Sequence, residues 1–437
     1  MKPFQLIDRT NGGSIKNDLL SGITVALALV PEAVAFAFVA GISPIVGLYG
    51  AFMMGLVTAI FGGRPGMISG ATGAMAVVMV SLVSQGNELG GTESAGLQYL
   101  FATLLLAGLI QVSAGVLRLG KFVRMIPHSV MMGFVNGLAI VIFLSQLGMF
   151  KSNGQWLVGS SLWIMLGLVA TTMLIMALLP LVTKKVPAAL TAIVVVSLVV
   201  IFGGLETETV KSFIVANGGE GIKAGLPRFQ VPLISFSLET LFFIAPYAFI
   251  LAAIGLIESL MTLNLIDELT ETHGSGNREC VAQGAGNILN GFFGGMGGCA
   301  MIGQSIINIK SGGRGRLSGI TAALALLFFI LFGSSYIEQV PIAALVGVMF
   351  MVVLGTFAWS TFKVWNKVPN ADMIVIILVT VITVLFDLAI AVLAGVIVSS
   401  LVFAWENAKR IRARKHVDEH GVKHYEIYGP LFFGCIE

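Results

Sequence analysis

A glycine-dense run from Asn290 to Arg316 most constrains how this chain can fold. It reads NGFFGGMGGCAMIGQSIINIKSGGRGR and lies between long apolar segments. Its glycines and polar residues make a poor continuous membrane helix, so protein rather than lipid must surround its backbone. A comparable interruption, FGGRPGMISGATGA, runs from Phe61 to Ala74 and is followed by a short apolar stretch. Two interrupted segments, one in each half of a chain, are typical of a transporter's binding site near the membrane midplane.

The chain as a whole is apolar enough to lie in a membrane. Of its 437 residues, 57% are hydrophobic and 11% are charged, whereas soluble proteins carry roughly 25% charged residues. Its first apolar stretch lacks the cleavage site of a signal peptide, so we expect it to be retained. Cys280, Cys299 and Cys435 are too scattered for a disulfide framework or a metal cluster. These features predict a polytopic membrane protein without a cofactor.

Spans of about 20 helical residues divide the sequence into fourteen transmembrane segments. The two interrupted runs are the third and tenth segments, which we expect to be half-helices. The pattern therefore predicts an all-α polytopic membrane fold. The remaining spans are expected at about 18–38, 45–61, 97–117, 128–148, 157–180, 187–204, 238–264, 280–294, 317–335, 340–358, 370–386 and 388–405.

The basic residues of the loops predict the orientation, because cytoplasmic loops are rich in Lys and Arg. With a cytoplasmic N-terminus, the outer loops carry few basic residues and the inner loops carry most of the others. An even number of crossings then places both termini in the cytoplasm of a bacterium, with the chain in its plasma membrane. The outer set is Lys151, Lys211, Lys223 and Arg228.

A long connection between about 204 and 235 divides the segments into two repeats of seven, at about 1–204 and 236–405. An odd number of crossings in each repeat makes the second repeat inverted relative to the first. After residue 405, a basic cluster at 409–415 is typical of a membrane-proximal linker. The following HYEIYGPLFFGCIE alternates like a strand. We expect residues 406–437 to be a basic linker and the first strand of a truncated cytoplasmic domain.

The interrupted segments predict an anion site. A helix that begins inside a membrane directs its unpaired amides, which carry about half a positive charge, at whatever lies before it. Such a helix start binds anions without a basic residue. Alternatively, the glycines serve only close helix packing. The candidate substrate-binding residues are Thr72, Gly73 and Ala74 in the first half and Ala300, Met301 and Ile302 in the second.

Two carboxylates in apolar segments are candidates for coupling anion entry to a cation. A charge at the bilayer centre costs about 3 kcal/mol or more, so such a group is retained for function or is held neutral by hydrogen bonds. Glu258 lies inside the eighth span with Thr262 one turn further on, and Glu32 follows Pro31 in the first span. A carboxylate beside hydroxyls could hold a proton or coordinate Na⁺, with Glu258 and Thr262 as the metal ligands. The alternative for each is a protonated structural glutamate.

Several motifs resemble the SulP family of anion transporters, the bacterial relatives of the SLC26 proteins. They are VPEAVAFAFVAGISPIVGLYGAF at 30–52, ISGATGAMAVV at 68–78, RMIPHSVMMGFVNGLAI at 124–140 and GGMGGCAMIGQSIINIKSGGR at 294–314. The resemblance implies a nucleobase-permease-like fold, with a core domain of segments one to four and eight to eleven and a gate domain of five to seven and twelve to fourteen. It also implies a STAS domain that begins in the tail, and a homodimer.

Among branches of this family, the chain looks most similar to cyanobacterial sodium-dependent bicarbonate transporters. Thr72 matches a substrate-binding threonine of that branch, and Glu258 and Thr262 match its sodium ligands, although its acid is typically Asp. Ala300, Met301 and Ile302 replace small and hydroxyl residues. Glu32 also departs from many relatives, and an extra carboxylate favours proton coupling.

The sequence therefore predicts a secondary active transporter of a small inorganic anion, bicarbonate or sulfate, coupled to Na⁺ or H⁺ by movement of the core domain against the gate domain. A sulfate or C4-dicarboxylate/H⁺ symporter is an alternative, with a nucleobase permease less favoured. A passive anion channel is an alternative of another class. An enzyme is disfavoured, because the sequence has no Ser/Lys dyad, paired aspartates or metal motif.

Overall fold

The computed structural model describes most of the chain between residue 14 and residue 428. Two compact units make up the chain, one formed by Met1–Met125 and Leu138–Phe357, the other by Ile126–Gly137 and Ala358–Glu437. The described residues are 14–92, 94–120, 128–152, 155–183, 188–216, 225–235, 237–364, 370–385, 394–395, 397–398, 400–401, 412–417 and 423–428.

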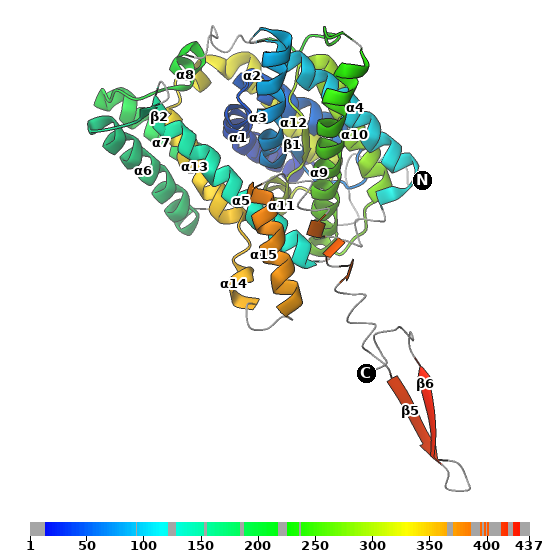
Figure 1. Cartoon of the computed structure of the whole chain (residues 1–437). Coiled ribbons are helices and arrows are strands. Elements are labelled where there is room, and N and C mark those ends of the chain that lie inside the picture. Colours follow the sequence, from blue (N-terminus) through cyan, green and yellow to red (C-terminus); the bar gives the residue numbers. More distant parts are fainter. Residues whose placement is uncertain are drawn as a thin grey trace. The chain divides into compact units, whose positions relative to one another are not determined.

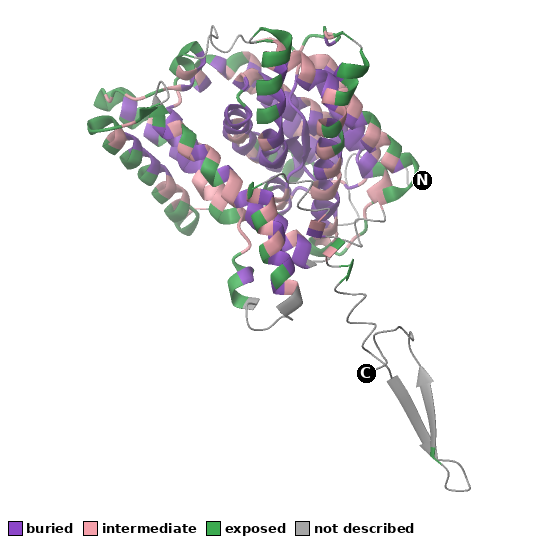
Figure 2. Cartoon of the chain, viewed as in Figure 1, coloured by how far each residue is buried: buried purple, intermediate pink, exposed green. Residues whose placement is uncertain are grey.

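The first unit is built around a bundle of helices that surrounds two short strands (Figure 1). Helix α10 packs against α4 and α2, and α1 packs against α12 and α2. Figure 2 shows that buried residues gather in this bundle. Its elements are α1 (Ile15–Val39), α2 (Pro44–Phe61), β1 (Ser69–Ala71), α3 (Gly73–Gly90), α4 (Ala95–Val116), α9 (Leu238–Thr270), α10 (Gly276–Phe293), β4 (Gly298–Ala300), α11 (Ile302–Lys310) and α12 (Arg316–Glu338).

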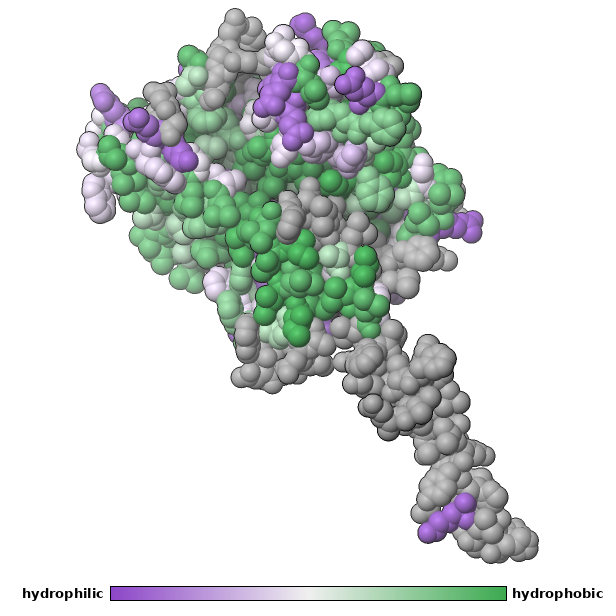
Figure 3. Space-filling view, viewed as in Figure 1, coloured by the Kyte–Doolittle hydropathy of each residue, from purple (hydrophilic) through white to green (hydrophobic). Residues whose placement is uncertain are grey.

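Other helices of the first unit expose apolar side chains that have no protein around them. On α6, Trp163 is 74% exposed and Leu181 is 82% exposed. Such side chains suit a lipid environment, which is as apolar as they are. Figure 3 shows apolar residues over much of the face that it draws. The remaining elements of this unit are the later part of α5 (His128–Leu147), a 3-10 helix (Gly148–Phe150), β2 (Lys151–Ser152), β3 (Gln155–Trp156), α6 (Ser160–Val182), α7 (Ala188–Gly203), α8 (Val210–Ala216) and α13 (Ile342–Thr356).

The second unit contains the first part of α5 and the C-terminal elements. Within it, the Asn136 side chain donates to Thr361 Oγ1 over 2.8 Å and accepts from the amide of Ala358 over 2.8 Å. The first part of the predicted terminal strand lies in β6, which pairs antiparallel with β5, and the rest of it, 429–437, lies outside the described residues. Strand β5 occupies part of the segment that was expected to be a basic linker. The elements are α14 (Ser360–Val364), α15 (Asn370–Leu385), β5 (Arg412–Val417) and β6 (Lys423–Tyr428).

Eight helices of the described part are long and apolar enough to cross a membrane. They correspond to the first, second, fourth, fifth, sixth, eighth, eleventh and twelfth expected segments. The seventh and thirteenth are shorter apolar helices, Ala188–Gly203 and Asp372–Leu385. The ninth segment, α10, is a helix that carries several buried polar side chains. Most of the fourteenth, 388–405, lies outside the described residues.

The helices of the two interrupted segments differ in length. Helix α11 has 9 residues, which span about 14 Å, or half of the hydrocarbon layer. Helix α3 has 18 residues and continues to Gly90, but it is not among the helices that are long and apolar enough to cross a membrane. Helix α3 is capped at its C-terminal end by Gly91, which adopts a left-handed conformation that favours glycine.

Glycine packing between α4 and α10 gives a stability prediction. A Cβ at Gly284 would lie 2.5 Å from the Gly108 carbonyl oxygen and 2.7 Å from the Val112 nitrogen. We expect Gly284→Ala to push the helices apart and to destabilise the fold by about 1–3 kcal/mol, which thermal denaturation in detergent would measure as a lower midpoint. Gly167→Ala on α6 is the matched control, because a Cβ there meets no atom within 4 Å. Equal midpoints for the two variants would contradict this account of the packing.

Candidate functional site

The two interrupted segments meet through their strands. β1 and β4 pair antiparallel, with Ser69 opposite Ala300, Gly70 opposite Cys299 and Ala71 opposite Gly298. Both strands are completely buried. A Cβ at Gly298 would lie 2.2 Å from the Gly70 carbonyl oxygen, so this position requires glycine. The glycines that make these segments poor membrane helices thus allow two strands to approach inside the bundle.

Each strand leads directly into a helix that has no side-chain cap. Helix α3 begins at Gly73 after Thr72, whose side chain makes no capping hydrogen bond. Helix α11 begins at Ile302 after Met301, which has no polar side chain to cap it. The first helical hydrogen bonds run from Ala76 to Thr72 over 3.0 Å and from Ser305 to Met301 over 3.0 Å. The amides of the first helical residues, from Gly73 in α3 and from Ile302 in α11, therefore make no hydrogen bond within their helices and can face a ligand.

The three predicted residues of the second half differ in what their amides do: two amides bond to neighbouring elements, and one begins a helix. The amide of Ala300 donates to Ser259 Oγ over 3.0 Å, and the amide of Met301 donates to the Ile68 carbonyl oxygen over 2.9 Å. These two amides hold β4 in place. Ile302 is the first residue of α11, and the next residue, Gly303, is exposed. A Cβ at Gly303 would meet no atom within 4 Å, so the start of α11 borders open space.

Glu258 and Thr262 lie beside β4. Thr262 Oγ1 donates to the Glu258 carbonyl oxygen over 2.8 Å and lies 3.4 Å from the Ala300 carbonyl oxygen. Glu258 Oε2 accepts a hydrogen bond from Cys299 Sγ over 3.0 Å. Cys299 Sγ is also 3.3 Å from Thr72 Oγ1. The carboxylate, hydroxyl and carbonyl oxygens are the kind of donor that hard cations such as Na⁺ prefer.

Glu32 occupies a different position from Glu258. It lies in α1 directly after Pro31, and its Oε1 accepts from Gln304 Nε2 over 2.8 Å. Gln304 is in the first turn of α11 and is almost completely buried. The structure therefore brings Glu32 to the α11 start and Glu258 to the strand that precedes it. Sequence reasoning did not identify Gln304 or Cys299 as partners of these acids, since both contacts join segments far apart in the chain.

A frame of buried amide and hydroxyl side chains holds the strands. Asn287 on α10 accepts from the Gly298 amide over 3.0 Å and donates to the Gly298 carbonyl oxygen over 3.1 Å. It also donates to Gln111 Oε1 on α4 over 2.9 Å. On the other strand, Gln283 Nε2 donates to Ser69 Oγ over 2.9 Å. These side chains satisfy backbone and hydroxyl groups that would otherwise be buried without partners.

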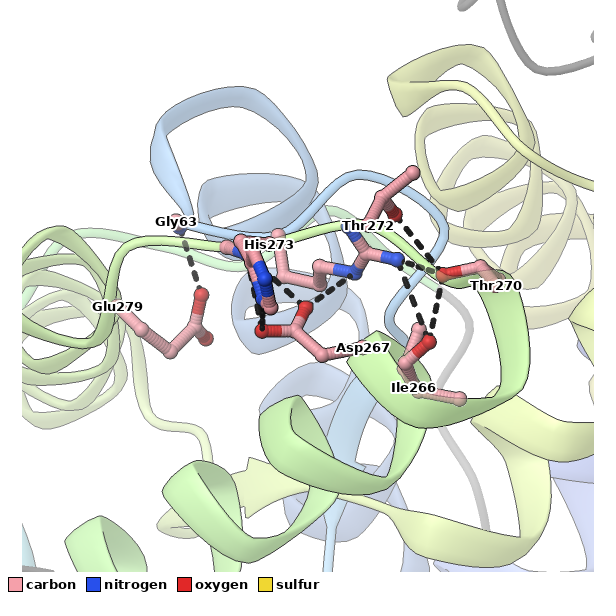
Figure 4. Close-up of polar contacts among 9 residues, drawn as sticks. Gly63, Ile266, Asp267, Thr270, Thr272, His273 and Glu279 are labelled. Carbon is pink, nitrogen blue, oxygen red and sulfur yellow. Dashed lines mark hydrogen bonds and ion pairs between the residues drawn. The ribbon is translucent and has the colours of Figure 1, made fainter. Parts of the chain in front are cut away.

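An ion pair fastens the loop before β1 to the end of α9. Arg64 Nε lies 3.1 Å from Asp267 Oδ1, and both side chains are largely buried. The Arg64 guanidinium also donates to the Ile266 carbonyl oxygen over 3.3 Å and to the Thr270 hydroxyl. Figure 4 shows Ile266, Asp267 and Thr270 with the polar contacts at this end of α9. Arg64 thus closes the C-terminal end of α9, where positive charge is favourable, and takes no part in the candidate site.

The family of the chain is shown by comparison with known proteins. The Sulfate permease family matches residues 15–379. The chain therefore belongs to this family. YbaR of Bacillus subtilis, provisionally named a sulfate transporter, is 45% identical over 427 residues, which cover 97% of this chain and 84% of YbaR. Bicarbonate transporter BicA of Picosynechococcus is 33% identical over 413 residues, which cover 91% and 72%. These relatives are named as transporters and not as enzymes.

Solved structures agree with this assignment. The transmembrane domain of a cyanobacterial bicarbonate transporter BicA aligns with a TM-score of 0.74 at 32% sequence identity, covering 86% of this chain and 97% of that chain. A structure of SLC26A9 aligns with a TM-score of 0.78, covering 94% of this chain and 69% of that chain. Its 18% identity supports the fold alone. The chain is a multi-pass, mostly helical membrane protein of the same fold.

Removal of the Asn287 side chain tests the frame around β4. We expect Asn287→Leu to lower thermal stability and to weaken anion binding, because it leaves the buried amide and carbonyl of Gly298 unpaired at about 1–3 kcal/mol each. Thermal denaturation and binding of labelled sulfate and bicarbonate would measure the two effects. Gln85→Leu is the control, because Gln85 is exposed and bonds only Tyr247 in the described part. Wild-type stability and binding in Asn287→Leu would contradict the role of the frame.

Proposed function

We propose that this chain is a secondary active transporter of a small inorganic anion, bicarbonate or sulfate, coupled to Na⁺ or H⁺. The observation that carries the proposal is the pair of uncapped helix starts that follow the paired strands β1 and β4. The amides at two such helix starts supply partial positive charge at a place where the described contacts include no basic side chain. The names of the relatives, a sulfate transporter and a bicarbonate transporter, support the choice of anions.

In this proposal the anion is held by amides at Gly73 and Ala74 on one side and at Ile302 on the other, with the Thr72 hydroxyl between the helices. Ala300 and Met301 contribute the strand that positions Ile302. Backbone donors of this kind recognise charge and size and discriminate weakly between oxyanions. This explains why the site residues alone leave bicarbonate and sulfate as alternatives.

Glu258 is proposed to hold the coupling cation together with Thr262. Glu258 as a whole residue is partly buried, whereas Thr262 and the neighbouring Cys299 are completely buried. Oxygens of Glu258, Thr262 and the Ala300 carbonyl would suit Na⁺, and the carboxylate alone would suit H⁺. Glu32 is a second proposed proton carrier, beside the start of α11.

Transport is proposed to use an elevator movement of a core domain against a gate domain. Both domains are built from two inverted repeats of seven segments. Core segments one to four and eight to eleven contain the paired strands and both helix starts, so they would carry the bound anion as one body. The proposal includes cytoplasmic termini and a homodimer, as the family resemblance implies. A sulfate or C4-dicarboxylate/H⁺ symporter and a passive anion channel are the competing functions.

Neutralising Glu258 tests the coupling. We expect Glu258→Gln to abolish concentrative anion uptake into proteoliposomes, because the amide keeps the shape of the side chain and loses the charge that attracts a cation. Exchange of labelled anion at equal concentrations should persist. Glu268→Gln is a matched control on the exposed part of the same helix. Full cation-driven accumulation by Glu258→Gln would disprove the coupling role.

Counterflow measurements separate the competing functions. Proteoliposomes loaded with bicarbonate, sulfate or fumarate would be tested for uptake of the same labelled anion, with Na⁺ or choline outside and with or without a pH gradient. We expect bicarbonate or sulfate to be exchanged and concentrated by one of the two cation gradients. Preference for fumarate would favour the dicarboxylate symporter. Saturating anion currents that ignore both gradients would favour the channel.

A further inference from the structure

Three side chains from three elements form a continuous polar chain at the candidate site. The Cys299 thiol on β4 lies 3.0 Å from Glu258 Oε2 on α9 and 3.3 Å from Thr72 Oγ1 at the start of α3. Cys299 is completely buried and Thr72 is 2% exposed, whereas Glu258 is only partly buried. The buried thiol thus links the carboxylate of Glu258 to a hydroxyl at the proposed anion site.

The position of Thr72 makes the direction of its hydroxyl proton important. A threonine before a helix usually accepts a hydrogen bond from an amide of the first turn. Thr72 makes no such bond, and its hydroxyl faces the thiol instead. A hydroxyl has one proton to donate. If that proton points at Cys299 Sγ, the Thr72 lone pairs face the helix start, where an anion would be repelled.

The charge of Glu258 determines the direction in which the hydrogen bonds of this polar chain run. A carboxylate only accepts hydrogen bonds, so the single Cys299 S–H proton is directed at Glu258 Oε2. The sulfur can then act only as an acceptor toward Thr72, which must donate to it. A cation bound at the carboxylate would compete for the same oxygen. The thiol could then turn its proton to Thr72 Oγ1, and Thr72 could donate its own proton to an anion.

We propose that Cys299 is a positioning residue that couples the cation site to the anion site by reversing this chain. The inference rests on the proposed function, because it assumes that a cation binds at Glu258 and an anion at Thr72. No bond is made or broken in this step, because the thiol proton is redirected by rotation about the Cβ–Sγ bond of Cys299 and the hydroxyl proton by rotation about the Cβ–Oγ1 bond of Thr72. Cation binding thereby raises anion affinity, and by thermodynamic linkage anion binding raises cation affinity by the same factor.

A packing role for Cys299 makes a different prediction. A buried cysteine can act simply as a small hydrophobic residue, in which case alanine would replace it with little effect on coupling. Serine at position 299 keeps one donor proton and acceptor lone pairs, whereas alanine removes both. Cys280 supplies a control of the same residue type, because it is equally buried but lies on α10, outside the polar chain.

The test is the cation dependence of anion affinity in the full chain. Binding of labelled sulfate and labelled bicarbonate would be measured for wild type, Cys299→Ala, Cys299→Ser and Cys280→Ala, in NaCl and in choline chloride and, for sulfate, at two pH values. We expect the cation to raise wild-type anion affinity by about 5- to 150-fold, the usual range of coupling. Cys299→Ala should reduce this factor to about twofold or less, while Cys299→Ser and Cys280→Ala retain most of it.

Several outcomes would overturn the inference. Full coupling in Cys299→Ala contradicts it, and so does loss of coupling in Cys299→Ser when Cys299→Ala binds the cation normally. If Cys299→Ala does not fold, Cys299→Val, which also lacks donor and acceptor, takes its place with thermal denaturation as the check. A wild-type protein whose anion affinity ignores both Na⁺ and pH refutes the proposed coupling function together with this inference. If the cation raises anion affinity equally in wild type and in Cys299→Ala, the inference is refuted and the proposed function stands.

Discussion

The pairing of β1 with β4 is the interaction on which the rest of the site depends. A membrane protein interior offers no water to satisfy an irregular backbone, so two segments that leave the helical conformation must find partners in each other or in side chains. The antiparallel register from Ser69 opposite Ala300 to Ala71 opposite Gly298 supplies the first kind of partner. Because each strand runs directly into a helix, this register also determines how close the two helix starts lie.

The second kind of partner comes from helices that are more polar than a lipid-facing helix could be. Asn287 satisfies both backbone groups of Gly298, and Ser259 accepts from the Ala300 amide. The polar side chains of α10 are thus directed at the strands rather than at lipid. This accounts for its absence among the helices that hydropathy alone would place across a membrane. The same arrangement leaves donors at the helix starts free, because the frame satisfies the strands and stops at Met301.

Much of the candidate site follows from residue patterns. The glycine-rich interruptions predicted two intramembrane helix starts, and helices begin at Gly73 and Ile302. Glu258 and Thr262 both lie on α9 with contacts to β4, and their role as cation ligands stays a prediction. Other features escaped this reasoning. The strands were not foreseen, since a three-residue strand has too few residues to show a period of two.

The sequence by itself determined that this is a polytopic membrane protein of the Sulfate permease family, with two interrupted segments and acids in apolar surroundings. These properties depend on composition and on residues that are neighbours in the chain. Only the tertiary structure decided which amides at the helix starts are free, that Gln304 contacts Glu32, and that Cys299 connects Glu258 with Thr72. Such contacts join segments far apart in the chain. A hydrogen bond needs its two atoms within about 3 Å, and only packing of the whole bundle sets that distance.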